Sequence, residues 1–172
     1  KKVAENVILY SSNPIIYVVK DFIEHKECKA FIEEFESESL GGFSKTKNDN
    51  KKSLNKKIIN YSIDHNANDH LHSLSKRLSI LAQIPIRNAE PYELTHYQQG
   101  AQTSAISEAF DVDCKTDQEK LSQGGQRVLS TVFFLNEKGE GNGIEFPNLQ
   151  LSILVKQGDV LVLHNTIDAS HH

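Results

Sequence analysis

The pattern of apolar and polar positions divides the chain into short apolar runs and two segments with helical periodicity. Residues 6–10 and 14–19 are β-branched and aromatic runs separated by Ser-Ser-Asn-Pro, which predicts two strands joined by a turn. The next segment places apolar groups on one helical face, with Lys and Glu opposite, and Asp21 stands where an N-cap belongs. This helix is expected to end near residues 37–41, where Ser and Gly accumulate. Its apolar face consists of Phe22, Ile23, Phe31, Ile32 and Phe35.

A second helix is predicted after a strand at residues 57–63. Asn68 or Asp69 can cap it, and Ile84-Pro85 closes it. Leucines at helical spacing form an amphipathic stripe that is expected to be core. These leucines are Leu71, Leu74, Leu78 and Leu81.

From Glu90 onward the pattern changes to short strands separated by Gly and Asn turns, which is typical of a β-sandwich or jelly roll. Residues 111–125 are polar without alternation, so they are predicted to be a loop, a candidate lid or substrate loop. The strands are expected at residues 92–97, 103–110, 127–135, 144–146, 149–155 and 160–164.

Composition narrows the class of protein. The 172 residues fit one domain, and a net charge of −4 provides no field that would attract nucleic acid or anionic lipid. No run of about 18 apolar residues predicts a membrane span. Cys28 and Cys114 lie far apart with no CxxC, which disfavours a disulfide scaffold or zinc cluster and favours a reduced, cytoplasmic setting. The chain begins at Lys1 and lacks Met, so we expect a piece of a longer product.

One basic segment, residues 45–57, combines six lysines with Asn and Ser. A solvated loop is the ordinary interpretation of such a run. The alternative is a contact surface for an acidic partner.

Four motifs in the second half occur in an order that resembles one enzyme family. They are Tyr97-Gln-Gln-Gly100, Gly124-Gly-Gln-Arg-Val-Leu-Ser-Thr-Val-Phe-Phe-Leu-Asn136, Gly141-Asn-Gly-Ile-Glu-Phe-Pro147 and Val155-Lys-Gln-Gly-Asp-Val-Leu-Val-Leu-His-Asn165. Together they resemble the prolyl 4-hydroxylase-like branch of the iron(II)/2-oxoglutarate dioxygenases.

The resemblance implies an α+β, mainly β fold: a double-stranded β-helix, or jelly roll, with supporting N-terminal helices. We therefore expect one dioxygenase-like domain over residues 1–172. Helical support would occupy about residues 20–85 and the jelly-roll core about 90–172, truncated at its C-terminus.

In the resembled family, two His and one carboxylate hold iron(II), and two of these ligands come from a His-x-Asp on one strand. The spacing of two is needed because alternate residues of a strand face the same side. Here that motif falls on Ile106-Ser107-Glu108. Ile106 has no lone pair, so Glu108 is the one metal ligand that the motif retains. The family's second His and the basic residue for 2-oxoglutarate are expected beyond His172.

The resemblance also implies a co-substrate pocket, whose candidate residues are Tyr97, Thr103, Arg127 and Thr131. Thr103 takes the place of a pocket Tyr in the family. Arg127 and Thr131 are expected to share one face of a strand. Because a buried Arg needs a carboxylate partner, Arg127 could meet an acidic ligand or Glu145, or pair across the sheet.

Other histidines are candidate metal ligands. His25 in His-Lys-Glu and the pair His70 and His72 lie at predicted helix starts, where solvated imidazoles are the simpler interpretation and metal binding the alternative. His164 ends a predicted strand, so packing and ligation remain alternatives there.

Three functions remain open. The first is an enzyme in which iron(II) and 2-oxoglutarate hydroxylate a peptidyl or free prolyl carbon. The second is a pseudoenzyme, a dioxygenase fold without its metal that binds a peptide or protein partner. The third is a jelly-roll binder of sugars or small acids that shares only the architecture. Neither nucleic acid nor a membrane is expected as a partner.

Overall fold

The computed structural model describes residues 1–36, 43–45, 58–101, 103–136 and 143–165. The fold is mixed α/β, with mostly strands in antiparallel sheets and few helices. The chain divides into two compact units. Unit 1 combines residues 1–33 with 107–172, and unit 2 is residues 34–106. A jelly roll, helical support for it and one domain over the whole chain stay predictions.

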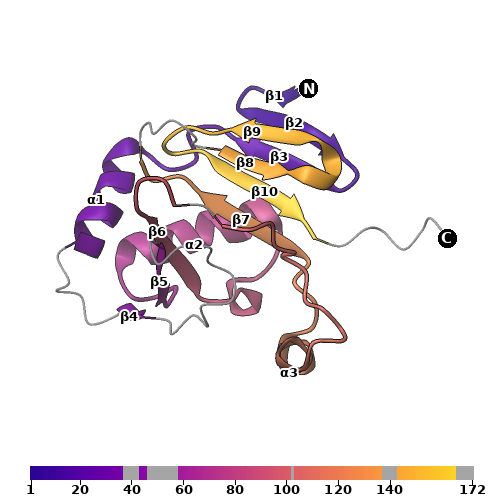
Figure 1. Cartoon of the computed structure of the whole chain (residues 1–172). Helices are drawn as coiled ribbons and strands as arrows, with labels where there is room; N and C mark the ends of the chain where they lie inside the picture. Colours follow the sequence, from indigo (N-terminus) through magenta and orange to yellow (C-terminus); the bar gives the residue numbers. More distant parts are fainter. Residues whose placement is uncertain (37–42, 46–57, 102, 137–142, 166–172) are drawn as a thin grey trace. The chain divides into compact units, whose positions relative to one another are not determined.

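The main element of unit 1 is a five-stranded sheet in the order β1-β2-β3-β10-β7 (Figure 1). Every neighbouring pair is antiparallel. On the interior strand β10, Val162 lies opposite Tyr17 of β3 on one side and Thr131 of β7 on the other. The strands are β1 (Lys2–Ala4), β2 (Val7–Ser12), β3 (Ile15–Val19), β7 (Leu129–Phe133) and β10 (Val160–His164).

A two-stranded hairpin covers one face of this sheet. It consists of β8 (Gly143–Phe146) and β9 (Leu151–Leu154), joined by the 3-10 turn η2 (Pro147–Leu149). Buried side chains from both layers form the core of the unit. The adjacent residues Leu161 and Val162 are both buried although they point to opposite faces, so both faces of β10 are covered. The buried core cluster consists of Ile16, Val18, Ile153, Val155 and Leu161.

Gly158 and Asp159 fix how the chain approaches β10. Gly158 has a φ of +84°, its carbonyl accepts a hydrogen bond of 2.9 Å from the backbone of Ile23, and an added Cβ would collide with the Ile23 carbonyl oxygen. Asp159 is 1% exposed, and its carboxylate accepts hydrogen bonds from Lys20 Nζ at 2.7 Å and from the Lys156 backbone at 2.9 Å. The family-like Gly-Asp motif is therefore a structural junction with residues 20–23.

The first helix, α1 (His25–Glu36), begins later than the sequence predicted. Asp21 as its N-cap is wrong, because Asp21 has a φ of +52° and lies four residues before the helix. Its backbone N–H instead points at Asp159 Oδ1, at 3.3 Å. Phe31 on this helix is buried, as the apolar face predicted, and Cys28, which was not part of that prediction, is buried as well.

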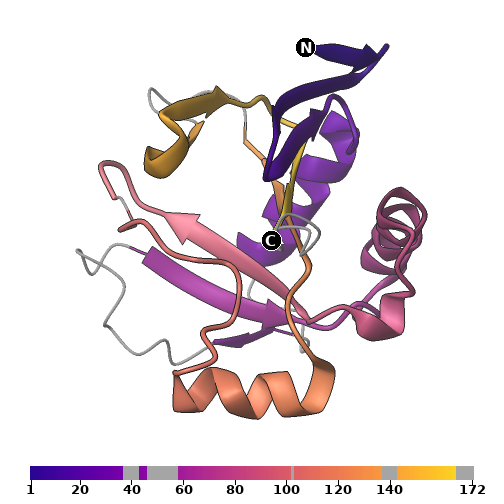
Figure 2. The same cartoon turned by 90° about the vertical axis from the view of Figure 1, so that its right-hand side faces the viewer.

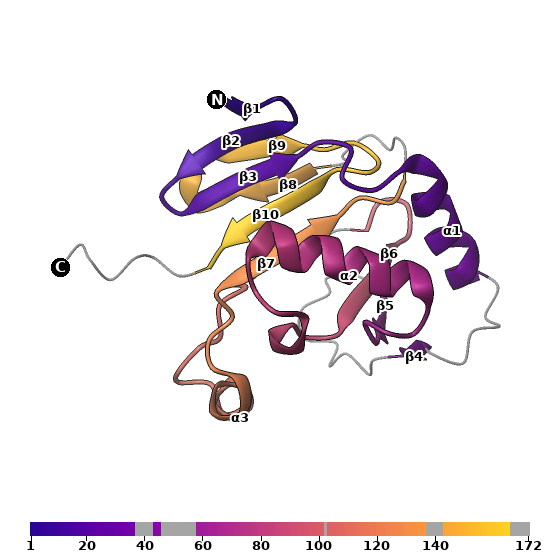
Figure 3. The same ribbon diagram turned by 180° about the vertical axis from the view of Figure 1, so that it is seen from behind.

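Unit 2 contains a three-stranded sheet and a helix. The sheet has the order β4 (Phe43–Lys45), β5 (Ile58–Ile63) and β6 (Tyr92–Tyr97), and Figure 2 shows β5 and β6 as adjacent ribbons. The helix α2 (Asp69–Ala82) lies on the near side of β5 and β6 in Figure 3, and the 3-10 turn η1 (Ile86–Asn88) follows it.

The predicted start of α2 is confirmed, and its predicted core face is confirmed in part. Asn68 Oδ1 accepts a hydrogen bond of 2.8 Å from the Leu71 backbone, which makes Asn68 the N-cap. Leu71 and Leu74 are buried, whereas Leu78 and Leu81 are only partly buried.

Two predictions for the second half are wrong. Residues 104–110 form no strand, and only Thr103 makes an isolated bridge. The predicted loop at 111–125 contains the helix α3 (Lys115–Gly124). Because α3 buries none of its residues, it has no apolar stripe that periodicity could detect.

The basic segment lies outside the described residues apart from Lys45, the last residue of β4. In the described parts of the chain, no helix has the length and apolar character needed to cross a bilayer.

Candidate functional site

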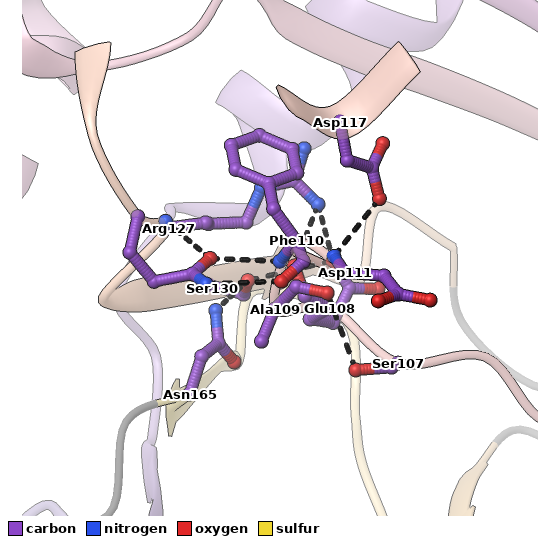
Figure 4. A network of polar contacts seen from close by, with 10 residues as sticks. Ser107, Glu108, Ala109, Phe110, Asp111, Asp117, Arg127, Ser130 and Asn165 are labelled. Carbon is purple, nitrogen blue, oxygen red and sulfur yellow. Dashed lines mark hydrogen bonds and ion pairs between the residues drawn. The ribbon is translucent and has the colours of Figure 1, made fainter. Parts of the chain in front are cut away.

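The candidate site is a polar network in unit 1 that begins with an ion pair between Glu108 and Arg127 (Figure 4). Arg127 Nη1 lies 3.2 Å from Glu108 Oε2 and also donates a hydrogen bond of 3.0 Å to the Glu108 backbone carbonyl. The two side chains are 25% and 33% exposed, so the pair is partly shielded from water. One guanidinium group thus holds both the charge and the backbone of Glu108.

Ser130 and Asn165 extend the network into the sheet. Ser130 lies on β7 opposite Leu163, and its Oγ donates to Glu108 Oε2 at 3.4 Å. Asn165 follows β10, and its Nδ2 donates a hydrogen bond of 2.8 Å to Ser130 Oγ. Asn165 comes two residues after Leu163, so strand alternation puts it on the same face as Ser130.

Asn165 Oδ1 is an unusual feature of this network. It is buried and has no hydrogen-bond partner among the described residues. A buried acceptor without a donor costs about 1–3 kcal/mol, so this oxygen is a position where a donor would be stabilising.

Phe110 and Gln126 close the network on its other side. The Gln126 side chain accepts a hydrogen bond of 2.7 Å from the Phe110 N–H and donates one of 3.0 Å to its carbonyl. The Arg127 guanidinium carbon lies 4.6 Å from the centroid of the Phe110 ring, and Lys120 Nζ lies 5.2 Å from it. Both distances fall within the range of cation–π attraction.

The described residues do not fit the iron site of the resembled family. That site needs three ligating side chains, and the described parts contain no group of three or more His, Cys, Asp or Glu residues that could hold a metal. Glu108 supplies one carboxylate, which is already paired with a cation. Ile106 is 51% exposed and lies outside any strand, so the alternation expected for a His-x-Asp motif does not apply there.

Arg127 has a carboxylate partner, as its sequence context predicted, but the partner is Glu108 rather than Glu145. Arg127 lies two residues before β7 begins, so strand geometry does not place it on one face with Thr131. Thr131 is partly buried opposite Val162. Its neighbour Ser130 is the residue of β7 that contacts Glu108.

The other predicted pocket residues, Tyr97 and Thr103, belong to unit 2. Tyr97 ends β6 and is 49% exposed, and Thr103 forms the bridge described above. A co-substrate role for Tyr97, Thr103, Arg127 and Thr131 stays a prediction, as does metal ligation by Glu108.

The other candidate histidines lie at two helix starts and at the end of a strand, as predicted. His25 is exposed at the first position of α1, and His70 and His72 lie in the first turn of α2. His72 Nδ1 is 2.9 Å from Asn66 Oδ1. The His164 ring centroid lies 6.3 Å from that of Tyr17 in a tilted arrangement, which is a packing contact.

Sequence reasoning did not single out Phe110, Gln126, Ser130 or Asn165. The available signals were polar residues inside or beside apolar strand patterns, namely Ser130 within β7 and Asn165 directly after β10. The pairing register of β7 and β10 turns these signals into one network, and that register was not predictable.

Comparisons with known proteins agree with the direction of the family resemblance. A "Putative prolyl 4-hydroxylase" of Acanthamoeba polyphaga mimivirus is 28% identical over 81 residues, which cover 47% of this chain and 34% of that protein. "Prolyl 4-hydroxylase 5" of Arabidopsis thaliana is 28% identical over 74 residues, which cover 43% of this chain and 24% of that protein. The matches thus span about a third of one relative's length and about a quarter of the other's. No protein-family model matches the chain.

Proposed function

We propose that this chain is a dioxygenase-type domain related to the prolyl 4-hydroxylases, with a jelly-roll core, that binds a peptide or protein partner instead of catalysing iron-dependent hydroxylation. The observation that carries the proposal is which residues occupy the expected ligand motif. Its first position is Ile106, which offers no lone pair, and its last, Glu108, is paired with the Arg127 guanidinium.

The chemistry of the metal supports this proposal. Enzymes of the resembled family depend on two imidazoles and one carboxylate, which leave open positions for 2-oxoglutarate and oxygen. A single carboxylate already neutralised by Arg127 does not replace such a set. Arg127 would also repel a divalent cation that approached Glu108.

A thermal-stability titration tests the proposal. A ligand that binds only the folded state raises the unfolding midpoint, so manganese(II) with 2-oxoglutarate can replace the reactive iron complex. We expect no shift of the midpoint with micromolar manganese(II) and 2-oxoglutarate, and a shift with proline-rich peptides. A rise of several degrees with the metal and co-substrate would contradict the proposal.

The second candidate is an active prolyl or peptidyl hydroxylase with iron(II) and 2-oxoglutarate, and the names of the two similar proteins favour it. The double variant Ile106→His with Glu108→Asp separates the candidates. If residues 106–108 occupy the place of the family's motif, the variant gains affinity for manganese(II) over the unmodified chain. An unmodified chain that already binds the ion as tightly as the variant would favour the enzyme.

A further inference from the structure

We infer that Arg127 takes the structural place of a metal ion as the counter-charge of Glu108, and that their ion pair closes the neck of a polar excursion at residues 111–125. The inference deepens the proposed function, because it concerns the same ligand position and assigns what holds it. It rests on that proposal in one respect, namely that Glu108 occupies the carboxylate position of the family's ligand motif.

The neck consists of residues 108–110, which precede the excursion, and residues 126–127, which follow it. At its outer level, the Gln126 side chain bonds both the N–H and the carbonyl of Phe110, at 2.7 and 3.0 Å. At its inner level, Arg127 bonds the backbone and the carboxylate of Glu108. The Arg127 guanidinium also lies over the Phe110 ring and connects the two levels (Figure 4).

The excursion itself has little to hold it except this neck. Its helix α3 buries none of its ten residues, so apolar packing does not fix it. Its acidic groups serve local turns: the Asp111 N–H bonds Asp117 Oδ2 at 3.1 Å, and the Asp113 N–H bonds Asp111 Oδ1 at 2.9 Å. Lys120, 5.2 Å from the Phe110 ring centroid, adds one contact back to the neck.

Arg127 supplies Glu108 with the positive charge that a bound cation would otherwise have to supply. Glu108 Oε2 accepts hydrogen bonds from Arg127 Nη1 and from Ser130 Oγ. Ser130 Oγ in turn accepts a hydrogen bond from Asn165 Nδ2. A carboxylate anchored to β7 in this way needs a positive charge beside it. In a metal site the ion supplies that charge, and here the guanidinium does.

Contacts of this kind are individually weak, so the excursion should open locally, without unfolding of the sheet. Opening separates Glu108 from Arg127 and Gln126 from Phe110 together, since the same few residues carry both levels. Losing the charge of either partner should therefore raise the open population of residues 111–125 and of no other segment.

Amide hydrogen exchange of the whole chain tests this, with Glu108→Gln, Arg127→Gln and the double variant. We expect exchange of the 111–125 peptides to rise about two- to five-fold in each single variant, the size expected for a partly exposed ion pair. The double variant should exchange no faster than the faster single variant, because both changes remove one interaction. Peptides from β3 and β10 should not change.

The Lys29–Glu33 pair on α1 provides the matched control, since its side chains are 76% and 64% exposed. Glu33→Gln should leave the exchange of residues 111–125 unaltered. Added salt gives an independent arm that does not depend on how a variant folds. Salt screens the ion pair, so 0.5 M sodium chloride should speed exchange of 111–125 in the unmodified chain more than in Glu108→Gln.

Unchanged exchange of residues 111–125 in Glu108→Gln would overturn the inference, as would an equal rise in β3 and β10. These outcomes are distinct from failure of the proposed function. Tight binding of manganese(II) and 2-oxoglutarate by the unmodified chain would refute the binding-module proposal. Exchange of residues 111–125 would still report whether Arg127 closes the neck.

Discussion

At the scale of single residues, Gly158 and Asp159 show how a motif that resembles part of an enzyme family can have a structural role. Gly158 leaves space for the Ile23 carbonyl, and Asp159 binds Lys20 and two backbone N–H groups. Both residues tie the chain before β10 to the segment that leads into α1. Close backbone approach explains why residue 158 is glycine, and charge pairing explains why residue 159 is aspartate. Neither residue type requires contact with a substrate.

Gly158→Ala should be strongly destabilising. The new Cβ would collide with a backbone carbonyl and would also require an unfavourable positive φ, so we expect a loss of about 3 kcal/mol or more in the free energy of unfolding. Gly100→Ala is the matched control, because Gly100 has a similar φ of +78° with open space around it. That change should cost only about 1–2 kcal/mol. Equal losses in urea unfolding would contradict this explanation.

Asp159→Asn tests the buried ion pair with little change of shape. The amide cannot replace the charge beside Lys20 Nζ, so the free energy of unfolding should fall by about 2–4 kcal/mol. Asp113→Asn, at an exposed site, should stay within about 0.5 kcal/mol of the unmodified chain in the same urea measurements. A loss at Asp159 no larger than at Asp113 would show that the pair contributes nothing to stability.

At the scale of elements, the hydrophobic pattern predicted most strands and both amphipathic helices. The strands β2, β3, β5, β6 and β10 occur at or within two residues of the predicted ranges, because β-branched and aromatic residues mark each of them. The segment 103–110 was misassigned because Ala105, Ile106, Ala109 and Phe110 make it apolar enough for a strand. Phe110 bonds the Gln126 side chain instead of a neighbouring strand.

The start of α3 gives a prediction about thiol chemistry. The Thr116 hydroxyl, 3.1 Å from Cys114 Sγ, and backbone N–H groups of the first turn lower the pKa of the Cys114 thiol. Burial raises the pKa of the Cys28 thiol, which is also inaccessible. Iodoacetamide should therefore modify Cys114 first, already below the usual thiol pH range, and reach Cys28 only after unfolding.

Thr116→Val is the corresponding variant. Loss of the hydroxyl should move the pH profile of Cys114 alkylation to higher pH and slow the reaction at neutral pH. Peptide-level mass spectrometry measures both cysteines in one experiment. A profile that superposes on that of the unmodified chain would exclude the Thr116 contact as the cause.

At the scale of the whole molecule, the candidate network joins residues that are distant in sequence. Glu108, Arg127, Ser130 and Asn165 come together because β7 pairs with β10 in one register. The sequence predicted both strands and a carboxylate partner for Arg127. It did not predict which carboxylate, since that depends on how a strandless segment runs beside the sheet.

Alkaline pH should weaken both units. Burial raises the pKa of Tyr17 in unit 1, and burial raises that of Tyr92 in unit 2 against the opposing effects of Ser75 and Arg77. The folded chain keeps these phenolic protons when the unfolded chain has lost them. The free energy of unfolding should therefore be unaffected by these groups below about pH 10 and fall as the pH rises above it.

Urea unfolding at pH 9 and pH 11 measures this loss. Tyr17→Phe and Tyr92→Phe should each reduce the difference between the two pH values, because phenylalanine has no proton to lose. The control is Tyr97→Phe, at an exposed position, which should leave the difference unaltered. If all three variants kept the full difference, other groups would be responsible for it.

The position of β10 between β3 and β7 has a consequence for biosynthesis. The hairpin of β2 and β3 is made early, yet Ile16 and Val18 are covered only when β10 and β9 arrive more than a hundred residues later. On a ribosome this interval lasts on the order of ten seconds. During that time the nascent hairpin exposes a hydrophobic strand edge. Molecular chaperones therefore have a defined segment to shield until translation passes residue 164.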